Sequence, residues 1–180
     1  MGIYRRVIVI VVLLLMACGG VYLYRSQVVD ENYTGQQEDF YSHRYPDQQG
    51  KAFDFAGLQG RVTVVNFWAT WCAPCRKEIP DLSAISQDYA QRRVAVIGIA
   101  ADDLPAIQEF LQAIPASYTF VAAEFDAMAI SRDLGNTKGI LPFTVLMDGD
   151  GNIITRISGL VHPMELRAML DKAVAGQISN

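Results

Sequence analysis

The sequence is poor in the side chains that bind metal ions and in clustered positive charge. Its 180 residues include three cysteines and two histidines, so a four-ligand zinc site at one cysteine pair would need Cys18, His43 or His162 to complete it. Lys and Arg number 15 against 19 Asp and Glu, and no basic patch occurs, which argues against nucleic acid as a partner. Internal repeats and low-complexity segments are absent, and the 51% of hydrophobic residues suffices for one complete core.

The sulfur that is present lies in one informative motif, Cys72-Ala73-Pro74-Cys75. Residues 62–68 before it are almost all apolar and rich in β-branched and aromatic side chains, which predicts a buried parallel strand. After it, Ile79, Leu82 and Ile85 are spaced for one face of a helix. The two cysteines therefore open a helix, on one turn, where they can close and reopen a tight disulfide.

The start of a helix gives the two thiols different roles. Unpaired backbone N–H groups and the macrodipole favour an anion there, so we expect Cys72 to be the exposed thiolate, with a pKa below about 8.5. Cys75, one turn deeper, is expected to resolve mixed disulfides. Two other interpretations stay open: half of a zinc site, and a permanent structural disulfide, although so short a loop constrains the unfolded chain little.

Residues 1–25 predict a membrane-targeting segment. Arg5 and Arg6 precede an uncharged stretch at 7–24, close to the ~20 residues that span a bilayer, and their charge predicts that the chain beyond the stretch is exported. The run Leu15-Met16-Ala17-Cys18-Gly19 also resembles a bacterial lipobox. The alternatives are an uncleaved signal anchor, with Cys18 an ordinary residue of its helix, and a lipoprotein signal cleaved before a lipidated Cys18. Either route tethers the protein to a membrane on its extracytoplasmic, periplasmic side.

The rest of the chain predicts a polar tether at 26–44 and one α/β domain at 45–176. We expect a small hairpin at 45–55, strands at 62–68, 94–100, 117–121, 143–147 and 153–158, and helices at 105–113, 127–134 and 163–175 besides the one that carries the cysteines. Strand–helix alternation followed by a terminal hairpin and helix predicts a central mixed sheet covered by helices on both faces.

Two segments carry a resemblance to a known family. Residues 67–80, around the cysteines, resemble the active-site segment of the TlpA/ResA-like membrane-anchored thiol-disulfide oxidoreductases of the thioredoxin superfamily. Residues 139–146 are similar to a second family landmark, a cis-proline that faces the dithiol, and the likeness covers about 45–175. It implies an α/β thioredoxin-like fold with an N-terminal hairpin extension.

The resemblance also implies roles for individual residues. Pro142 is expected in the cis form against Cys72, where it keeps metal ions away. The backbone of Leu141 is then free to pair with an extended substrate segment, and Trp71 belongs to the docking surface. An ordinary trans proline at the start of a strand is the alternative that the residues alone favour.

Glu78 is the candidate proton acceptor. Cytosolic thioredoxins carry a buried aspartate in the strand before the cysteines, whereas this chain has Asn66, which does not titrate. Glu78 follows Cys75 by three residues and so shares its helical face. We hypothesise that Glu78 accepts the proton of Cys75, with a pKa raised by apolar neighbours. The alternative is a solvated glutamate on the helix surface.

The predicted function is a membrane-tethered, extracytoplasmic thiol-disulfide oxidoreductase that mainly reduces disulfides of exported proteins. The resemblance implies substrates such as apocytochrome c or copper-site proteins, a membrane electron donor, and neither cofactor nor metal ion. A peroxiredoxin-like peroxidase is one alternative, although the proline of its cysteine loop is missing. A non-catalytic copper-delivery module that binds through Cys72, Cys75 and a histidine such as His162 is the other.

Overall fold

The computed structural model describes residues 2, 4, 16 and 39–178. Cys18, nearly all of the predicted membrane-targeting segment and residues 26–38 of the predicted tether lie outside these residues. In the described part of the chain, none of the helices combines the length and the apolar character that a membrane span requires.

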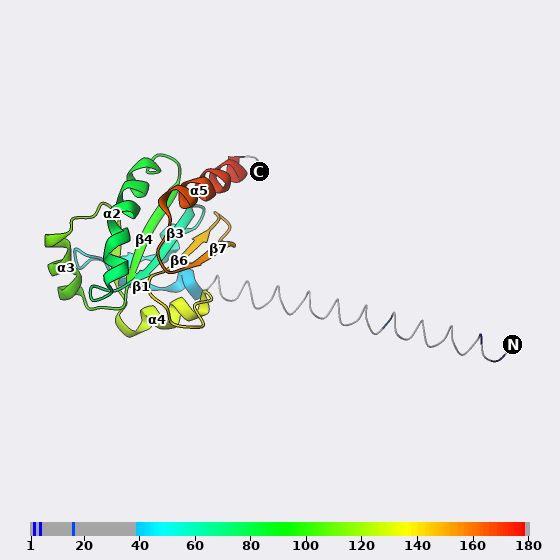
Figure 1. The fold of residues 1–180 in the computed structure, drawn as a ribbon, viewed down its shortest axis with the longest axis horizontal. Coiled ribbons are helices and arrows are strands. Elements are labelled where there is room, and N and C mark those ends of the chain that lie inside the picture. Colours follow the sequence, from blue (N-terminus) through cyan, green and yellow to red (C-terminus); the bar gives the residue numbers. More distant parts are fainter. Residues whose placement is uncertain (1, 3, 5–15, 17–38, 179–180) are drawn as a thin grey trace. The chain divides into compact units, whose positions relative to one another are not determined.

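The folded unit alternates strands and helices along the chain (Figure 1). The elements are β1 (Arg44–Pro46), β2 (Ala52–Asp54), the 3₁₀ helix η1 (Phe55–Leu58), β3 (Val62–Trp68), α2 (Ala73–Asp88), β4 (Val94–Ala100), α3 (Leu104–Ala113), β5 (Thr119–Ala122), α4 (Glu124–Asp133), β6 (Phe143–Met147), β7 (Ile153–Ser158) and α5 (Pro163–Ile178).

A five-stranded mixed sheet in the order β5-β4-β3-β6-β7 forms the centre. Strands β3, β4 and β5 are parallel, whereas β6 is antiparallel to β3 and β7 is antiparallel to β6. All seven residues of β3 and of β4 are buried, which explains why both strands are nearly continuous apolar runs. The predicted mixed sheet and thioredoxin-like α/β fold are confirmed.

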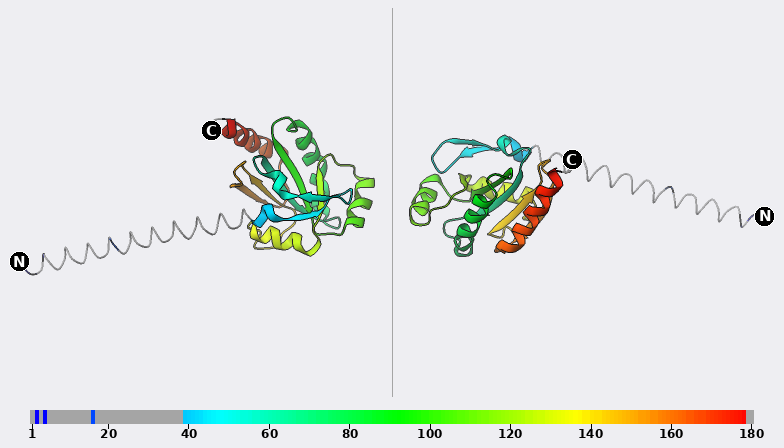
Figure 2. Two further views of the ribbon diagram at one scale, coloured as in Figure 1. Left: turned by 180° about the vertical axis from the view of Figure 1, so that it is seen from behind. Right: turned by 90° about the horizontal axis from the view of Figure 1, so that it is seen from above.

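Two apolar clusters lie on opposite faces of the sheet. Side chains of α2, α3 and α5 pack on one face around Trp68 and Leu82. On the other, α4, η1 and the β1–β2 hairpin contribute to a cluster around Phe55 and Phe67, and Figure 2 shows this hairpin and α4 from behind. Helices therefore cover both faces of the sheet, as predicted.

Glycine at position 98 leaves room for the rings of Phe120 and Trp68 to approach the backbone of β4 closely. A Cβ atom at Gly98 would come within 2.8 Å of the Phe120 ring and 3.1 Å of Trp68 Nε1. Trp68 is fully buried, with ring centroids 5.1 Å from both Phe110 and Phe120. The close approach anchors the end of β3, from which the cysteine loop departs.

Three boundaries differ from the sequence-based expectation. The packed unit reaches back to residue 39, because Phe40 and Tyr41, within the expected tether, are buried with Phe55. Helix α4 begins three residues early, at Glu124, without a side-chain cap that could have marked its start. Helix α5 continues past Gly176, since a glycine inside a helix costs only about 1 kcal/mol.

Candidate active site

The site lies at the edge of the sheet where the parallel strands end. Because β3, β4 and β5 share a direction, α2, α3 and α4 all begin at this edge. Strand β6 runs the opposite way, so the loop before it and the loop after β7 reach the same edge. Four other segments, far apart in the sequence, thus lie at the same edge as the start of α2.

Cys72 and Cys75 form a disulfide at the N-terminus of α2, with an S–S distance of 1.99 Å and a Cα–Cα distance of 5.3 Å. Cys72 is the N-cap residue, and its Sγ accepts a hydrogen bond of 3.3 Å from the backbone N–H of Cys75. An N–H group of the first helical turn therefore points at Cys72 Sγ, an arrangement that favours negative charge on this sulfur.

The two cysteines differ less in exposure than the sequence predicted, since Cys72 was expected to be exposed. Cys75 is fully buried, but Cys72 also retains only 6% of its surface. Cys72 is the more accessible of the pair and is nevertheless largely covered.

Glu78 lies inside the protein beneath the disulfide-bearing turn. Only 2% of it is exposed, so the alternative of a solvated surface glutamate is wrong. Its Oε1 accepts a hydrogen bond of 2.7 Å from Asn66 Nδ2, and its Oε2 accepts one of 3.0 Å from the backbone N–H of Val161. Burial raises the pKa of Glu78 above its ordinary value, the two hydrogen bonds oppose this, and the charge of Asp81 adds to the rise.

The polar neighbours of Glu78 were missed by sequence reasoning. Asn66 on β3 also donates to Thr144 Oγ1 on the adjacent β6, at 2.9 Å, while Asn66 Oδ1 is buried without a partner among the described residues. Tyr118 is buried as well, and its pKa is raised well above the ordinary value by burial and by the charge of Glu78. The position of Asn66 within an apolar strand was the available signal, but its two partners, Glu78 and Thr144, come from two distant segments.

The loop before β6 places Pro142 and Leu141 at the same edge. The Leu141–Pro142 peptide bond is cis, as the resemblance implied, and the Pro142 carbonyl accepts a hydrogen bond of 2.9 Å from Gly159. The backbone N–H and C=O of Leu141 make no hydrogen bond to any described residue. Asn136, another residue missed in the sequence, braces the loop through two bonds to Ile140, of 2.9 and 3.0 Å.

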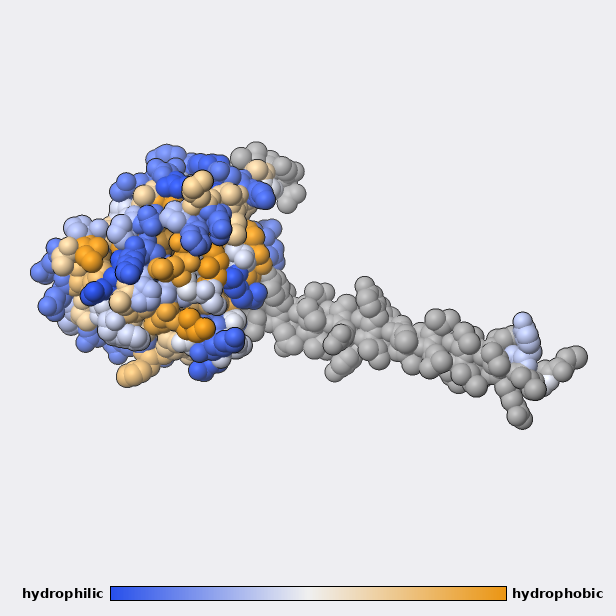
Figure 3. Space-filling view, in the orientation of Figure 1, coloured by the Kyte–Doolittle hydropathy of each residue, from blue (hydrophilic) through white to orange (hydrophobic). Residues whose placement is uncertain are grey.

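Trp71 stands beside the disulfide with 69% of its surface exposed. The face of the domain drawn in Figure 3 carries hydrophobic patches among hydrophilic side chains. His162 is exposed and His43 half-buried, in ring contact with Tyr45 and Phe55. Across residues 39–178, no three His, Cys, Asp or Glu side chains gather into a metal-binding group.

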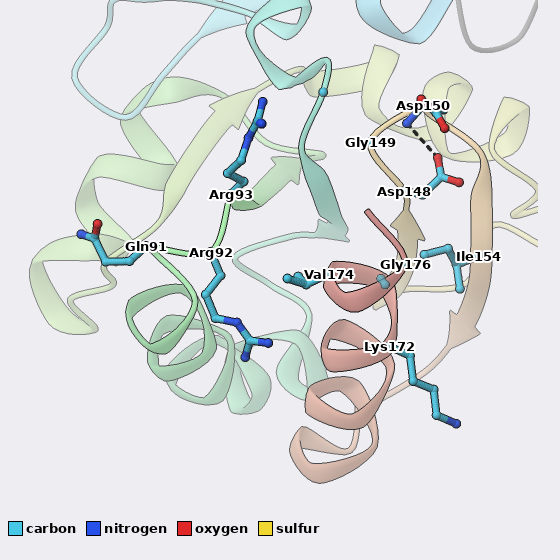
Figure 4. A pocket seen from close by; sticks show the side chains of 12 residues that line it. Gln91, Arg92, Arg93, Asp148, Gly149, Asp150, Ile154, Lys172, Val174 and Gly176 are labelled. Atoms are coloured by element: carbon cyan, nitrogen blue, oxygen red, sulfur yellow. Dashed lines mark hydrogen bonds between the residues drawn. The ribbon is translucent and has the colours of Figure 1, made fainter. Parts of the chain in front are cut away.

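A hollow of about 900 Å³ lies at the opposite edge of the sheet, where β3 and β4 begin. Arg92, Arg93 and Lys172 line it together with Asp148 and Asp150, and Figure 4 shows that the three cationic side chains do not converge on one point. This hollow is remote from the disulfide and plays no part in the site.

A Cys-x-x-Cys disulfide at the start of a helix, on a thioredoxin-like sheet and with a cis-proline at the same edge, defines the thiol-disulfide oxidoreductases. The model of the Redoxin family matches residues 36–170, and the chain belongs to this family. The predicted enzyme class is thereby confirmed.

Relatives and solved structures agree with this class. The chain is 28% identical to the thiol-disulfide oxidoreductase ResA of Bacillus cereus, over 93% of this chain and 96% of the relative. It is 35% identical to the thiol:disulfide interchange protein HelX of Rhodobacter capsulatus, over 65% of this chain and 63% of the relative. A thioredoxin-family thiol:disulfide interchange protein from Chlorobium tepidum has a similar structure, with a TM-score of 0.66, 29% identity, and coverage of 74% and 93% of the two chains.

Proposed function

We propose that the protein is a membrane-tethered, extracytoplasmic reductase of protein disulfides. The observation that carries the proposal is the Cys72–Cys75 disulfide at the start of α2, with the carboxylate of Glu78 buried in the same helix. Residues 1–25 provide the tether to the membrane, either as an uncleaved helix or through a lipidated Cys18.

In the proposed reaction, the Cys72 thiolate attacks one sulfur of a substrate disulfide. A mixed disulfide forms, and the other substrate sulfur leaves as a thiolate that takes a proton from water. Glu78 then accepts the proton of the Cys75 thiol, and the Cys75 thiolate attacks Cys72. The second substrate sulfur leaves as a thiolate and takes a proton from water, and Glu78 returns its proton to solvent. The Cys72–Cys75 disulfide is restored, and two electrons have passed to the substrate.

The docking surface consists of Trp71 and the Leu141–Pro142 segment. Leu141 offers an unpaired backbone donor and acceptor to an extended segment of the substrate, which adds to the protein as a short strand does. Exposed Trp71 supplies apolar contact beside the cysteines. Exported proteins such as apocytochrome c or copper-site proteins are the proposed substrates.

A chemical argument supports the proposal that the Cys72–Cys75 pair reduces substrates rather than oxidises them. Strong stabilisation of the Cys72 thiolate would make the pair an oxidant, and the intervening Ala73-Pro74 supplies no histidine for that purpose. Restoration of the dithiol then requires electrons from a donor in the membrane, because the compartment itself is oxidising.

Trapping of mixed disulfides tests the proposal. Cys75→Ser leaves Cys72 able to attack but removes the thiol that resolves the intermediate, so exported proteins are expected to remain attached in the native host. Cys72→Ser is the matched control and is expected to trap nothing. The proposal fails if purified protein does not reduce insulin, or if it consumes peroxide or binds a stoichiometric metal ion at the cysteines instead.

A further inference from the structure

Asp102 holds the turn that carries Cys72. Its Oδ2 accepts a hydrogen bond of 2.5 Å from the backbone N–H of Thr70, two residues before Cys72. The N–H of Cys72 in turn donates to the Ala69 carbonyl at 3.1 Å, which closes the turn 69–72. Asp102 follows the end of β4 and is half-buried, so its charge is fixed against this turn rather than free in solvent.

We propose that Asp102 is a positioning residue that also makes the dithiol a stronger reductant. Its carboxylate fixes the cysteine turn and, through its bond to the Thr70 N–H, holds a negative charge at the same turn as Cys72, whose sulfur becomes anionic on reduction in the proposed reaction. This inference rests on the proposed reductase function and supplies a structural reason for its direction.

The direction in which the Asp102 charge shifts the equilibrium between disulfide and dithiol follows from the charges of these two states. The disulfide is neutral, whereas reduction by two electrons gives a dithiol in which Cys72 carries thiolate charge. A nearby negative charge raises the free energy of the reduced form and leaves the disulfide unaffected. Asp102 therefore opposes the N-terminus of α2, which stabilises the same thiolate.

Other charged groups near the turn are placed differently. Arg76 and Lys77 are exposed on α2, where solvent and salt screen them. Asp103 is exposed and caps α3 by accepting from the N–H of Ala106 at 2.9 Å, so its carboxylate is tied to α3. Among the described residues, Asp102 is the carboxylate bonded to the cysteine turn.

The neighbouring acids provide a matched pair of variants. Asp102→Asn keeps an oxygen that accepts from Thr70 and removes the charge, and Asp103→Asn keeps the helix cap and also removes one charge. The equilibrium of the full-length oxidised protein with two glutathione thiols, giving dithiol and glutathione disulfide, is measured for both in a Cys18→Ser background. We expect Asp102→Asn to shift the equilibrium constant toward the dithiol roughly threefold to tenfold, and Asp103→Asn by less than about twofold.

A third variant separates charge from position. Asp102→Ala removes the charge and the bond, so the Thr70 amide is expected to exchange with solvent faster than in wild type, while Asp102→Asn restores its protection. Equal equilibrium shifts for Asp102→Asn and Asp103→Asn, or no shift for either, overturn the inference. These outcomes are independent of substrate turnover: failure to reduce insulin refutes the proposed function, whereas an unchanged glutathione equilibrium refutes only the role of Asp102.

Discussion

Replacement of Glu78 by glutamine tests the buried carboxylate by its effect on stability. Burial is the largest cause of the raised pKa of Glu78, above an ordinary value of 4.5. A carboxyl group whose pKa is raised by folding contributes stability that is fully present below the unfolded pKa and is lost as the pH rises through the folded pKa. Ionised Glu78 therefore destabilises the wild-type fold at neutral pH relative to acid pH.

The size of the expected change in the free energy of unfolding follows from the linkage between folding and proton binding by Glu78. Each unit by which folding raises the pKa costs the protein about 1.4 kcal/mol above that pKa. Glutamine does not titrate, so Glu78→Gln is expected to gain free energy of unfolding relative to wild type, at up to about 1.4 kcal/mol per pH unit, as the pH rises from 4.5 to the folded pKa. Above it, the difference is constant.

The glutamine fits the same hydrogen bonds. Its oxygen can accept from the Val161 N–H, which leaves its NH₂ group facing Asn66. A half turn of the Asn66 amide then presents Oδ1, which has no partner among the described residues, as the acceptor, and the Thr144 hydroxyl donates to Oδ1 in place of the bond that it now accepts from Nδ2. If the glutamine makes poorer hydrogen bonds than the carboxylate, the free energy of unfolding of the variant falls by the same amount at every pH. The pH dependence of the stability difference between Glu78→Gln and wild type is therefore unaffected.

The assay is urea unfolding of the oxidised protein between pH 4 and pH 8, followed by tryptophan fluorescence. Glu109→Gln, an exposed acid on α3, is the control for loss of one surface carboxylate. The same glutamine variant is expected to reduce insulin about 10²-fold more slowly, because it lacks the proposed proton acceptor. A stability difference between Glu78→Gln and wild type that does not change with pH would refute the reasoning, and unchanged turnover would remove Glu78 from the mechanism.

Three further substitutions have defined outcomes. Trp71→Ala is expected to change the free energy of unfolding by less than about 0.5 kcal/mol, because the side chain is exposed, but to raise KM for insulin without changing reaction with dithiothreitol. Asn136→Ala removes both bonds to Ile140 and is expected to cost about 2–3 kcal/mol in urea unfolding. Gly98→Ala drives a methyl group into Phe120 and is expected to cost about 1–3 kcal/mol, with a lower Tm as the readout.

The local pattern of the sequence was sufficient where neighbouring residues decide the structure. Strands β3, β4, β6 and β7 occupy the predicted residues. Continuous apolar runs mark β3 and β4, and the turn at 148–152 separates β6 from β7. The cysteine motif at the start of α2 was also predicted from the sequence, since the two cysteines and the helix that follows them are adjacent in the chain.

Contacts between segments that are distant in the sequence could not be predicted from the local sequence pattern. Burial of Glu78 was hypothesised, but its bonds to Asn66 and to the Val161 N–H depend on how α2, β3 and the loop after β7 meet. Phe40 and Tyr41 were assigned to a tether because polar residues surround them, whereas tertiary packing buries both. Asp102 gave no sequence signal, as its partner is a backbone N–H of another loop.

The polar residues buried around the dithiol are costly for the fold and useful for chemistry. Glu78 is the one carboxylate among the buried described residues, and removal of its charge is expected to stabilise the protein at neutral pH. The proposed proton-accepting role gives a reason for a carboxylate that destabilises its own fold, because the burial that raises the pKa of Glu78 also suits it to accept a proton. Stability and turnover must therefore change in opposite directions when Glu78 loses its charge, since one physical cause governs both.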